Sequence, residues 1–398
     1  MKAWIGNLRD GRRLLAVPHT AASWQQTLNR TDSTSVTVPL YASSQASETY
    51  RRIVADARLL DLRNTATVGK TFLALEDDGK VVGGPLVSRD YDANDKTVTL
   101  SGAGMLTYFD ARTILPPQAA STPLSDAQGA PDTSLDTTLT NLTWRTINKR
   151  IVQQALAWPT SVQCITFEED ATGTNGVTYR AVDLDSIGTV LENNSRRLNG
   201  CDFGFFPQRT PDRRGFEWML RTGNPRLNTH VTHRFDNTAS KRPLTDLENA
   251  EDGSTLATRA WVTGGKGDDK VLVGTAENTT LTDTGAPIWE TVDTSHTSVT
   301  DPDTLESYAR EIVRTGYQAV SGTPLKIHIS ALRNTGQLDI GNILTFKTIN
   351  EWMFTDGWHT RRIQALAHNE NSDFIEVTLG TVFTDTDTDT PQGDPYNG

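Results

Sequence analysis

The sequence predicts a β-rich α+β fold. Its polar residues are mostly Thr, Asn, Asp and Gly, which are typical of strands and of the turns between them. Only four methionines are present and long stretches of Ala, Leu, Glu and Lys are few, so an all-helical bundle is disfavoured. Short apolar segments also alternate with tight turns along much of the chain, which is the pattern of antiparallel strands.

Length and charge exclude several classes of protein. A chain of 398 residues has room for roughly two to four domains. It lacks the run of about 20 apolar residues that a membrane-spanning helix needs, and Arg and Asp occupy the N-terminal stretch where a signal peptide is apolar. The net charge of −11 repels phosphate and disfavours a protein that reads nucleic-acid sequence. Cys164 and Cys201 are too few for a disulfide framework or a zinc site, so we interpret them as small buried hydrophobic residues.

Residues 1–115 are expected to form a first β-barrel domain. Turns at Asp10-Gly11 and Asp78-Gly79 predict two hairpins, and apolar residues at helical spacing predict a short helix within residues 46–62. Strands joined by such short turns fit a small barrel or a sandwich. The expected strands cover residues 2–6, 13–18, 35–39, 69–75, 81–82 and 97–102.

An α+β module is expected over residues 135–250. Helical spacing of apolar residues predicts one helix over residues 144–158 and a second over residues 184–198. Aromatic-rich strands at residues 201–207 and 215–220 then predict a hairpin directly after the second helix.

The C-terminal third is expected to contain a strand-loop-helix segment over 251–322 and a second β-barrel domain over 323–383. The helix is well marked, because Asp301 is a preferred N-cap residue and Pro302 fits the first helical position. An Asp356-Gly357 turn and a closing apolar strand mark the second β domain.

Two segments have the composition of exposed chain. Residues 116–134 are rich in Pro, Ala and Ser and poor in bulky side chains, which is typical of a linker. Residues 384–398 form an acidic tail interrupted by Pro and Gly, and we expect this tail to be disordered.

An internal similarity relates residues 69–102 to residues 341–380. Each segment begins at a glycine that enters an apolar strand, continues through an Asp-Gly turn, and ends in Val-Thr-Leu shortly before Gly102 or Gly380. One supersecondary unit used twice would explain the pattern. The alternative is that two unrelated β domains share common turn residues.

Motifs for catalysis are absent from the sequence. It contains no nucleophile elbow, no H-E-x-x-H zinc helix and no phosphate-binding loop. The glycine-rich residues 264–269 lack the spacing of a phosphate loop and end in two carboxylates, so we interpret them as a flexible surface loop between strands. His230 and His233 would face opposite sides of a strand, and we interpret them as solvated residues rather than metal ligands.

The acidic clusters have equally plain interpretations. Residues 385–389 begin like an EF-hand loop but lack its glycine and its final glutamate. Residues 168–170 could serve a glycosidase only with a second acid across a cleft, and a solvated acidic turn is the simpler interpretation. His328 fits an ordinary alternating strand. We therefore predict no catalytic residue, no metal ligand, no cofactor and no enzymatic activity, while an enzyme without a local motif stays open.

The order of these features resembles minor tail proteins of long-tailed phages of actinobacteria. The resemblance covers about residues 1–383 and includes the linker, residues 191–203 (LENNSRRLNGCDF), residues 260–268 (AWVTGGKGD) and the segment that closes at Gly380. Those proteins are similar to the trimeric baseplate hub family, whose hub module recurs in tail-associated lysins and type VI spike proteins. For the fold, the resemblance implies two similar tube-type β-barrels separated by α+β modules.

For function, the resemblance implies a structural virion protein, a trimeric hub at the tail tip that joins the tail tube to the tip and lines the DNA exit channel. The implied partners are two further copies, distal tail and tail tube proteins, the tape measure protein, and other minor tail or fibre proteins. DNA would pass without specific binding along a lumen that is not net positive, and the chain would not insert into a membrane. The implied location is the virion tail tip, after assembly in the host cytoplasm. A cell-wall hydrolase acting on peptidoglycan or another glycan, and a receptor- or carbohydrate-binding tail protein, are the alternatives.

Overall fold

The computed structural model describes residues 1–380 except 57, 199, 239–241, 268–269, 297–298 and 318–319. Within these residues the strands form one sheet of 14 strands and three small sheets of two or three strands. The predicted β-rich α+β class is therefore confirmed. The predicted acidic tail at 384–398 lies outside the described residues. Among the described helices, none is long and apolar enough to cross a membrane.

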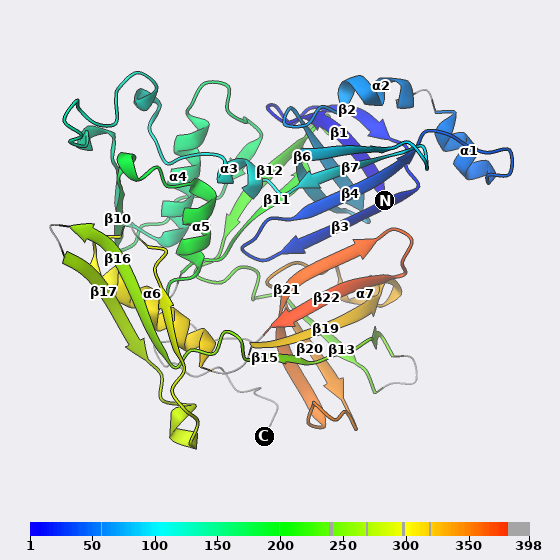
Figure 1. The fold of residues 1–398 in the computed structure, drawn as a ribbon. Coiled ribbons are helices and arrows are strands. Elements are labelled where there is room, and N and C mark those ends of the chain that lie inside the picture. Colours follow the sequence, from blue (N-terminus) through cyan, green and yellow to red (C-terminus); the bar gives the residue numbers. More distant parts are fainter. Residues whose placement is uncertain are drawn as a thin grey trace.

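The large sheet contains strands from both ends of the chain (Figure 1). Most neighbours are antiparallel, and the outermost strands at one end come from the first hairpin of the chain. In spatial order the strands are β14 (Leu244–Thr245), β19 (Val320–His328), β22 (Phe374–Gly380), β21 (Gly357–Asn369), β3 (Ala21–Thr27), β4 (Ser33–Pro39), β7 (Thr97–Ala103), β6 (Lys80–Asp92), β5 (Thr71–Asp77), β1 (Lys2–Asn7) and β2 (Arg13–Val17). Three more strands branch from this path: β15 (Ala250–Asp252) pairs with β19, β20 (Ile343–Thr348) with β21, and β13 (Thr232–Asp236) with β20.

The two predicted β domains are joined edge to edge. β3 from the N-terminal part pairs antiparallel with β21 from the C-terminal part, from Ser23 opposite Asn369 to Thr27 opposite Ala365. Both parts also contribute to one hydrophobic core, in which Trp24 and Leu100 share a cluster with Leu366. The expectation of two separate barrels needs correction on this point, because the described strands form a single open sheet over a shared core.

The internal similarity is a duplication of strand order. The neighbours β4-β7-β6-β5 in the first half correspond to β19-β22-β21-β20 in the second, and all of these pairs are antiparallel. β6 and β21 each have 13 residues, and β7 and β22 each have 7. Each long strand also carries a bulge at the same place, at Val87 in β6 and at Gln364 in β21. One supersecondary unit is thus used twice, as the sequence indicated.

The predicted alignment of the two copies is out of register. Gly102 does not correspond to Gly380, because Gly102 pairs with Leu86 before the bulge and it is Leu379 that pairs with the equivalent residue, Ile363. The match of Val-Thr-Leu misled the alignment, because these letters face the same sides of β7 and β22 but lie two positions apart in the shared register. Val98 corresponds to Ile375, and Leu100 corresponds to Val377. The turns differ as well. β5 and β6 are joined at Asp78-Gly79, whereas a longer loop joins β20 to β21.

The α+β module has its own hydrophobic core. α4 (Trp144–Leu156) and α5 (Ile187–Ser195) contribute to this core, and each begins at a hydroxyl residue that accepts a backbone hydrogen bond. β11 (Phe203–Arg209) and β12 (Phe216–Thr222) form the predicted hairpin after the second helix. Trp218 fixes the module to the large sheet, because its Nε1 donates a 2.8 Å hydrogen bond to the carbonyl oxygen of Gly83. The remaining strands are β8 (Thr137–Leu142), β9 (Ile165–Phe167) and β10 (Asn175–Tyr179).

A third core lies between α6 (Pro302–Gly316) and a small sheet of β16 (Arg259–Gly267), β17 (Lys270–Glu277) and β18 (Glu290–Asp293). Asp301 caps α6 as predicted, accepting a 2.9 Å hydrogen bond from the amide of Thr304. The predicted flexible loop at 264–269 is wrong for residues 264–267, which belong to β16, while 268–269 lie outside the described residues. A side chain at Gly264 would come within 2.6 Å of Leu305 on α6, so this glycine serves close packing of the helix.

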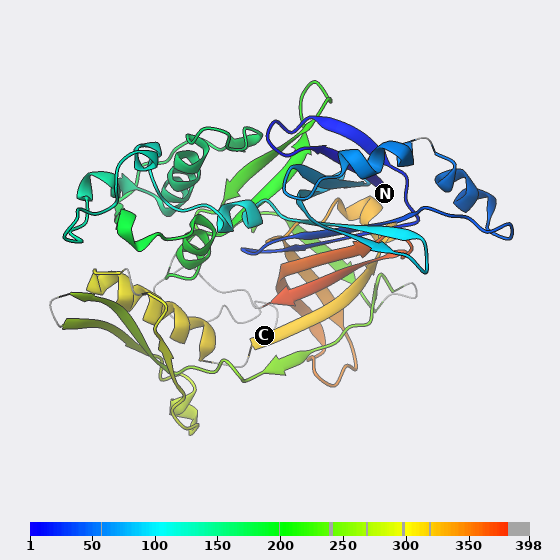
Figure 2. The ribbon, with the colours of Figure 1, turned by 45° about the horizontal axis from the view of Figure 1, so that its top comes forward.

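The other helices follow strands of the large sheet. The single helix predicted within 46–62 is two helices, α1 (Glu48–Val54) and α2 (Arg58–Thr65), separated at Asp56, whose carboxylate accepts a hydrogen bond from the amide of Arg58. α3 (Leu106–Asp110) follows β7, and α7 (Ile329–Thr335) follows β19. Residues 116–134 contain two single turns of 3₁₀ helix, η1 (Pro117–Ala120) and the beginning of η2 (Thr133–Leu135), and their role as an interdomain linker stays a prediction. Figure 2 shows the module of α4 and α5 next to the unit of α6, with the large sheet beside both.

Candidate functional surface and a buried polar centre

One face of the large sheet is accessible, and we call it the open face. Side chains alternate between the faces of a strand, so Trp24, Val36 and Leu100 are buried while their neighbours along each strand are more exposed. The open face continues across the junction of β3 and β21. Its residues are Ser23, Gln25 and Thr27 on β3, Ser33, Ser35 and Thr37 on β4, Thr97, Thr99, Ser101 and Ala103 on β7, Ser88, Asp90 and Asp92 on β6, Ala365, Ala367 and Asn369 on β21, and Phe374, Glu376 and Thr378 on β22.

Small uncharged side chains dominate the open face. The strands β3, β4, β7 and β22, and β21 from Ala365 onwards, place no Lys or Arg on it, and Glu376 is their one charged residue there. Towards one edge, β6 adds Asp90 and Asp92. At the other edge Lys326 of β19 forms a 2.8 Å ion pair with Asp246. Ser, Thr and Ala leave a shallow hollow of about 710 Å³ over the junction of the two halves.

On the buried side of the large sheet, polar contacts connect its N-terminal and C-terminal parts. Asp77, at the end of β5, accepts a 2.8 Å hydrogen bond from Trp24 Nε1 and lies 2.6 Å from Nδ1 of His368 on β21. Burial raises the pKa of Asp77, but the hydrogen bonds from His368 and Trp24 outweigh this and lower it overall. Burial lowers the pKa of His368, and the contact with Asp77 raises it overall. Lys80 makes a second bridge, with Nζ 2.5 Å from the carboxylate of Asp339.

Asp32 is a buried carboxylate close to this junction. It accepts a hydrogen bond from the amide of Thr27 at 3.2 Å and one from Gln26 Nε2 at 3.5 Å. Burial raises the pKa of Asp32 to about 7, and these hydrogen bonds with the nearby charge of Lys80 only partly oppose it. Asp32 is therefore a titratable carboxyl group beside the end of β3 that pairs with β21.

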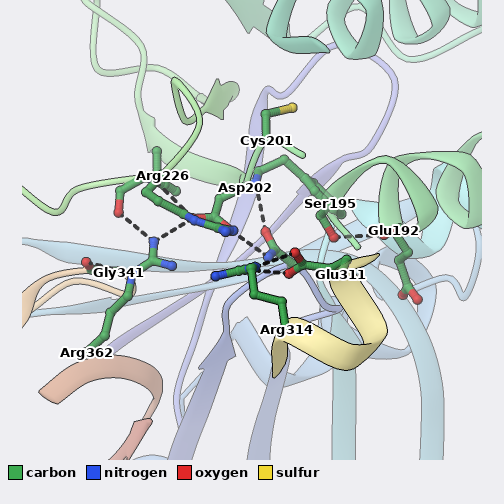
Figure 3. Close-up of polar contacts among 12 residues, drawn as sticks. Glu192, Ser195, Cys201, Asp202, Arg226, Glu311, Arg314, Gly341 and Arg362 are labelled. Carbon is green, nitrogen blue, oxygen red and sulfur yellow. Dashed lines mark hydrogen bonds and ion pairs between the residues drawn. The ribbon is translucent and has the colours of Figure 1, made fainter. Parts of the chain in front are cut away.

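A buried polar centre connects the large sheet to the α+β module (Figure 3). Asp202, just before β11, is 1% exposed, and its Oδ2 lies 2.5 Å from Nη2 of Arg362 on β21. Its Oδ1 accepts a 2.8 Å hydrogen bond from Asn29 and lies 3.7 Å from Arg226. Burial raises the pKa of Asp202, yet the charges of Arg362 and Arg226 lower it overall, so the ionised form is the stable one.

The same centre includes the unit of α6. Glu311 and Arg314 form a buried ion pair on this helix, with Arg314 Nη2 2.6 Å from Glu311 Oε1, and Figure 3 shows the pair beside Asp202 and Arg226. Burial raises the pKa of Glu311, and Arg314 and Arg226 oppose this. Three separately packed parts of the chain therefore meet at one set of buried charges.

Sequence reasoning missed this centre. Its residues are far apart in the chain, and neither Asp202 nor Arg362 belongs to a recognisable motif. The available signal was a charge inside an apolar stretch, as in Cys201-Asp202-Phe203, because a charge in such a stretch is usually buried with a partner.

Both cysteines are free and buried, as predicted. Burial raises the pKa of Cys164 and of Cys201 to about 12, so neither is a reactive thiolate. Asn148 lies beside Cys201, with its Nδ2 3.0 Å from the sulfur. The small-hydrophobe interpretation is confirmed for both residues.

The histidines considered as ligands are dispersed. His230 is exposed as predicted, but His233 is buried, with ring nitrogens 3.1 Å from the carbonyl oxygen of Thr335 and 3.0 Å from Asn342 Oδ1. The solvated-pair interpretation is wrong for His233, because β13 is covered on that side. His328 ends β19 and caps α7 through Ser330. Within the described residues, no three His, Cys, Asp or Glu side chains gather as a metal site.

The acidic turn at 168–170 is structural. Glu168 accepts a 3.1 Å hydrogen bond from the amide of Thr222 and pairs with Arg145. Asp170 pairs with Lys149 and with Arg150 on α4. These carboxylates hold the end of β9 against α4 and β12, so the solvated interpretation applies to them only in part.

Two solved structures share this fold over almost the whole chain. A tail protein from Neisseria meningitidis is 12% identical in sequence, with 95% of each chain covered and a TM-score of 0.51. The 43 kDa tail protein of prophage MuSo2 from Shewanella oneidensis is 8% identical, with 95% of this chain and 98% of that chain covered and a TM-score of 0.53. No protein-family model and no curated protein matches the sequence. The chain has the fold of these two tail proteins, so the resemblance seen in the sequence is confirmed at the level of the fold.

We predict that Asp202→Ala lowers the free energy of unfolding by about 3–5 kcal/mol, because it leaves Arg362 and Arg226 buried without their carboxylate. Adding Arg362→Met to this variant should recover part of the loss. The matched control is Asp246→Ala, which removes a carboxylate from an exposed ion pair with Lys326 and should cost less than about 1 kcal/mol. Urea unfolding followed by fluorescence measures all three, and equal losses at Asp202 and Asp246 would contradict the assignment.

We predict that Asp32→Asn stabilises the protein at pH 8 and flattens the dependence of its stability on pH. The folded pKa of Asp32, about 7, lies above the ordinary value of 3.8, so the folded state binds the extra proton between these values and loses stability as pH rises through them. The stability of the variant relative to the wild type should therefore increase from pH 4 to pH 7, by on the order of 4 kcal/mol, and stay constant above pH 8. Thermal unfolding across this range measures the difference, with Asp90→Asn on the open face as the control for charge. A constant difference from pH 4 to pH 8 would exclude Asp32 as the titrating group.

Proposed function

We propose that this chain is a structural virion protein, a trimeric hub at the phage tail tip that joins the tail tube to the tip and lines the DNA exit channel. The likeness of its fold to tail proteins supports this proposal. The observation that carries it is the duplicated strand order within one continuous sheet. Three copies would present six similar units around one axis, which matches a six-fold tail tube, and closed cyclic symmetry avoids open-ended growth.

The open face is proposed to line the channel. Each phosphate neutralised by Lys or Arg adds salt-dependent binding to DNA, so a wall that lets DNA slide must have few cations. Ser, Thr and Ala with scattered acids satisfy this requirement, as at Ser35, Thr99 and Ala367 beside Glu376. With these residues along its wall, the lumen of the proposed channel would not be net positive.

The proposed partners are other tail proteins. Distal tail and tail tube proteins, the tape measure protein and other minor tail or fibre proteins would contact the ends and outer surface of the ring. The loop between β20 and β21 offers an apolar contact point, because Trp352 is 94% exposed and Ile349 and Met353 are exposed beside it. The proposed location is the virion tail tip, after assembly in the host cytoplasm, and no membrane insertion by this chain is proposed.

Cryo-electron microscopy of the purified full-length chain tests the hub. We expect rings of three copies, with six similar lobes related by about 60° and with the strands that carry Ser35 and Ala367 facing the lumen. A monomer at micromolar concentration, or a ring whose lumen is lined by a different surface, would refute the proposal.

We also propose that the chain lacks hydrolytic activity, in contrast to the alternative of a tail-associated cell-wall or glycan hydrolase. The acidic turn at 168–170 supports this, because Glu168 and Asp170 form ion pairs with neighbouring cations. The purified chain should produce no clearing in a peptidoglycan zymogram in which lysozyme clears the gel. Clearing that disappears on replacing one carboxylate or one histidine would show the opposite.

A further inference from the structure

The second half of β6 is an unpaired sheet edge. β5 pairs with β6 only from Lys80 to Pro85, whereas β7 covers the other side of β6 from Leu86 to Asp92. Among the described strands, none pairs with Ser88–Asp92 on the side of β5. Residues 89–92 are exposed. Backbone donors and acceptors along this edge are therefore available to another strand.

The equivalent edge in the second half is occupied within the chain. The bulges place Ser88 of β6 at the position of Ala365 in β21, since the two residues pair with Ser101 and Thr378 directly after their bulges. The stretch of β21 from Ala365 to Asn369 pairs antiparallel with β3. The duplicated unit thus has an edge that accepts a strand. In the second half of the chain β3 occupies this edge along β21, whereas in the first half no described strand occupies it along β6.

β3, the strand that fills the edge of β21, has a counterpart in the second half of the chain. β3 lies beside β4, and β15 lies beside β19, which takes the place of β4 in the second half. Thr34 of β4 pairs with Gly102, and Thr323 of β19 pairs with the equivalent residue, Leu379, so Thr34 and Thr323 occupy the same position. Counting from these two residues, β15 (Ala250–Asp252) takes the position of residues 25–27 in β3. All three residues of β15 are exposed, and among the described strands β15 pairs only with β19.

We propose that copies of this chain join by strand addition, with β15 of one copy pairing antiparallel to the second half of β6 of the next. The inference rests on the proposed trimeric hub and names its interface. The internal junction sets the register: Gln25 opposite Ala367 becomes Ala250 opposite Asp90, Gln26 opposite Leu366 becomes Glu251 opposite Arg89, and Thr27 opposite Ala365 becomes Asp252 opposite Ser88. The sheet then continues from copy to copy as it continues within each one.

The charges fit this register. Glu251 stands opposite Arg89, and no two carboxylates stand directly opposite one another. Nη1 of Arg89 already donates to the carbonyl oxygens of Arg63 and Ala66, so Glu251 would add a favourable charge contact to a guanidinium that is held in place. A shift by one residue would place Glu251 opposite Asp90 and turn the two strands to different faces. The contact joins two different edges, so it is head-to-tail and requires ring closure to stay finite.

Disulfide trapping tests the register. The variant Ala250→Cys with Asp90→Cys places two thiols opposite each other on the open face, at the separation of about 4.5–5.5 Å typical of cross-strand partners. Mild oxidation should convert most of this variant into a covalent trimer on a non-reducing gel. The matched control, Ala250→Cys with Arg89→Cys, sets the thiols on opposite faces and should stay monomeric on the gel. Cys164 and Cys201 are buried and do not interfere.

Sedimentation of both reduced variants separates the two proposals. Trimers in solution that fail to cross-link at Ala250 and Asp90, or that cross-link equally well in the control, would overturn the proposed interface and leave the hub intact. The absence of trimers from both variants and from the wild type would overturn the hub itself. Ladders beyond the trimer would show an open chain of copies and overturn the closed ring.

Discussion

The pairing of β3 with β21 is the contact on which the rest of the architecture depends. It joins strands separated by more than three hundred residues, and it turns two β units into one sheet over one core. Such a non-local pairing pays a large loop-closure entropy, so it needs side-chain support as well as backbone hydrogen bonds. Asp77 provides that support from below the sheet, by accepting hydrogen bonds from Trp24 of β3 and contacting His368 of β21.

The buried centre around Asp202 solves a second problem, the orientation of the modules. Hydrophobic contacts hold surfaces together with little directional preference, whereas a hydrogen-bonded ion pair between Asp202 and Arg362 requires a defined geometry. The carbonyl oxygens of Leu227 and Gly341 also accept hydrogen bonds from Arg362, which fixes this side chain further. In the proposed hub, which would place a module outside a ring, such directional contacts would set an angle that apolar packing alone leaves free.

The sequence predicted local structure well and long-range structure only in part. Cap residues and apolar spacing identified α6 from Asp301 and the hairpin of β11 and β12, because those signals depend on near neighbours. The duplication was visible, but its register was not, because the loop between β20 and β21 is longer than the turn between β5 and β6, and because Val-Thr-Leu occurs at non-equivalent positions of β7 and β22. The pairing of β3 with β21 and the partners of Asp202 depend on contacts between distant parts of the chain, and no local pattern encodes them.

The differences between the two units are as informative as their similarity. Next to β5 lies β1 in antiparallel orientation, while next to β20 lies β13 in parallel orientation. The inner strands, which would form the wall of a ring, therefore repeat, and the strands beyond them diverge. A wall built from repeated strands needs equivalent surfaces to meet a six-fold tube. The flanking strands are under no such constraint, so the chain can vary them to attach the modules of α4, α5 and α6. In the proposed ring, threefold symmetry on the outside and near-sixfold symmetry on the inside would then be two consequences of one duplicated sheet.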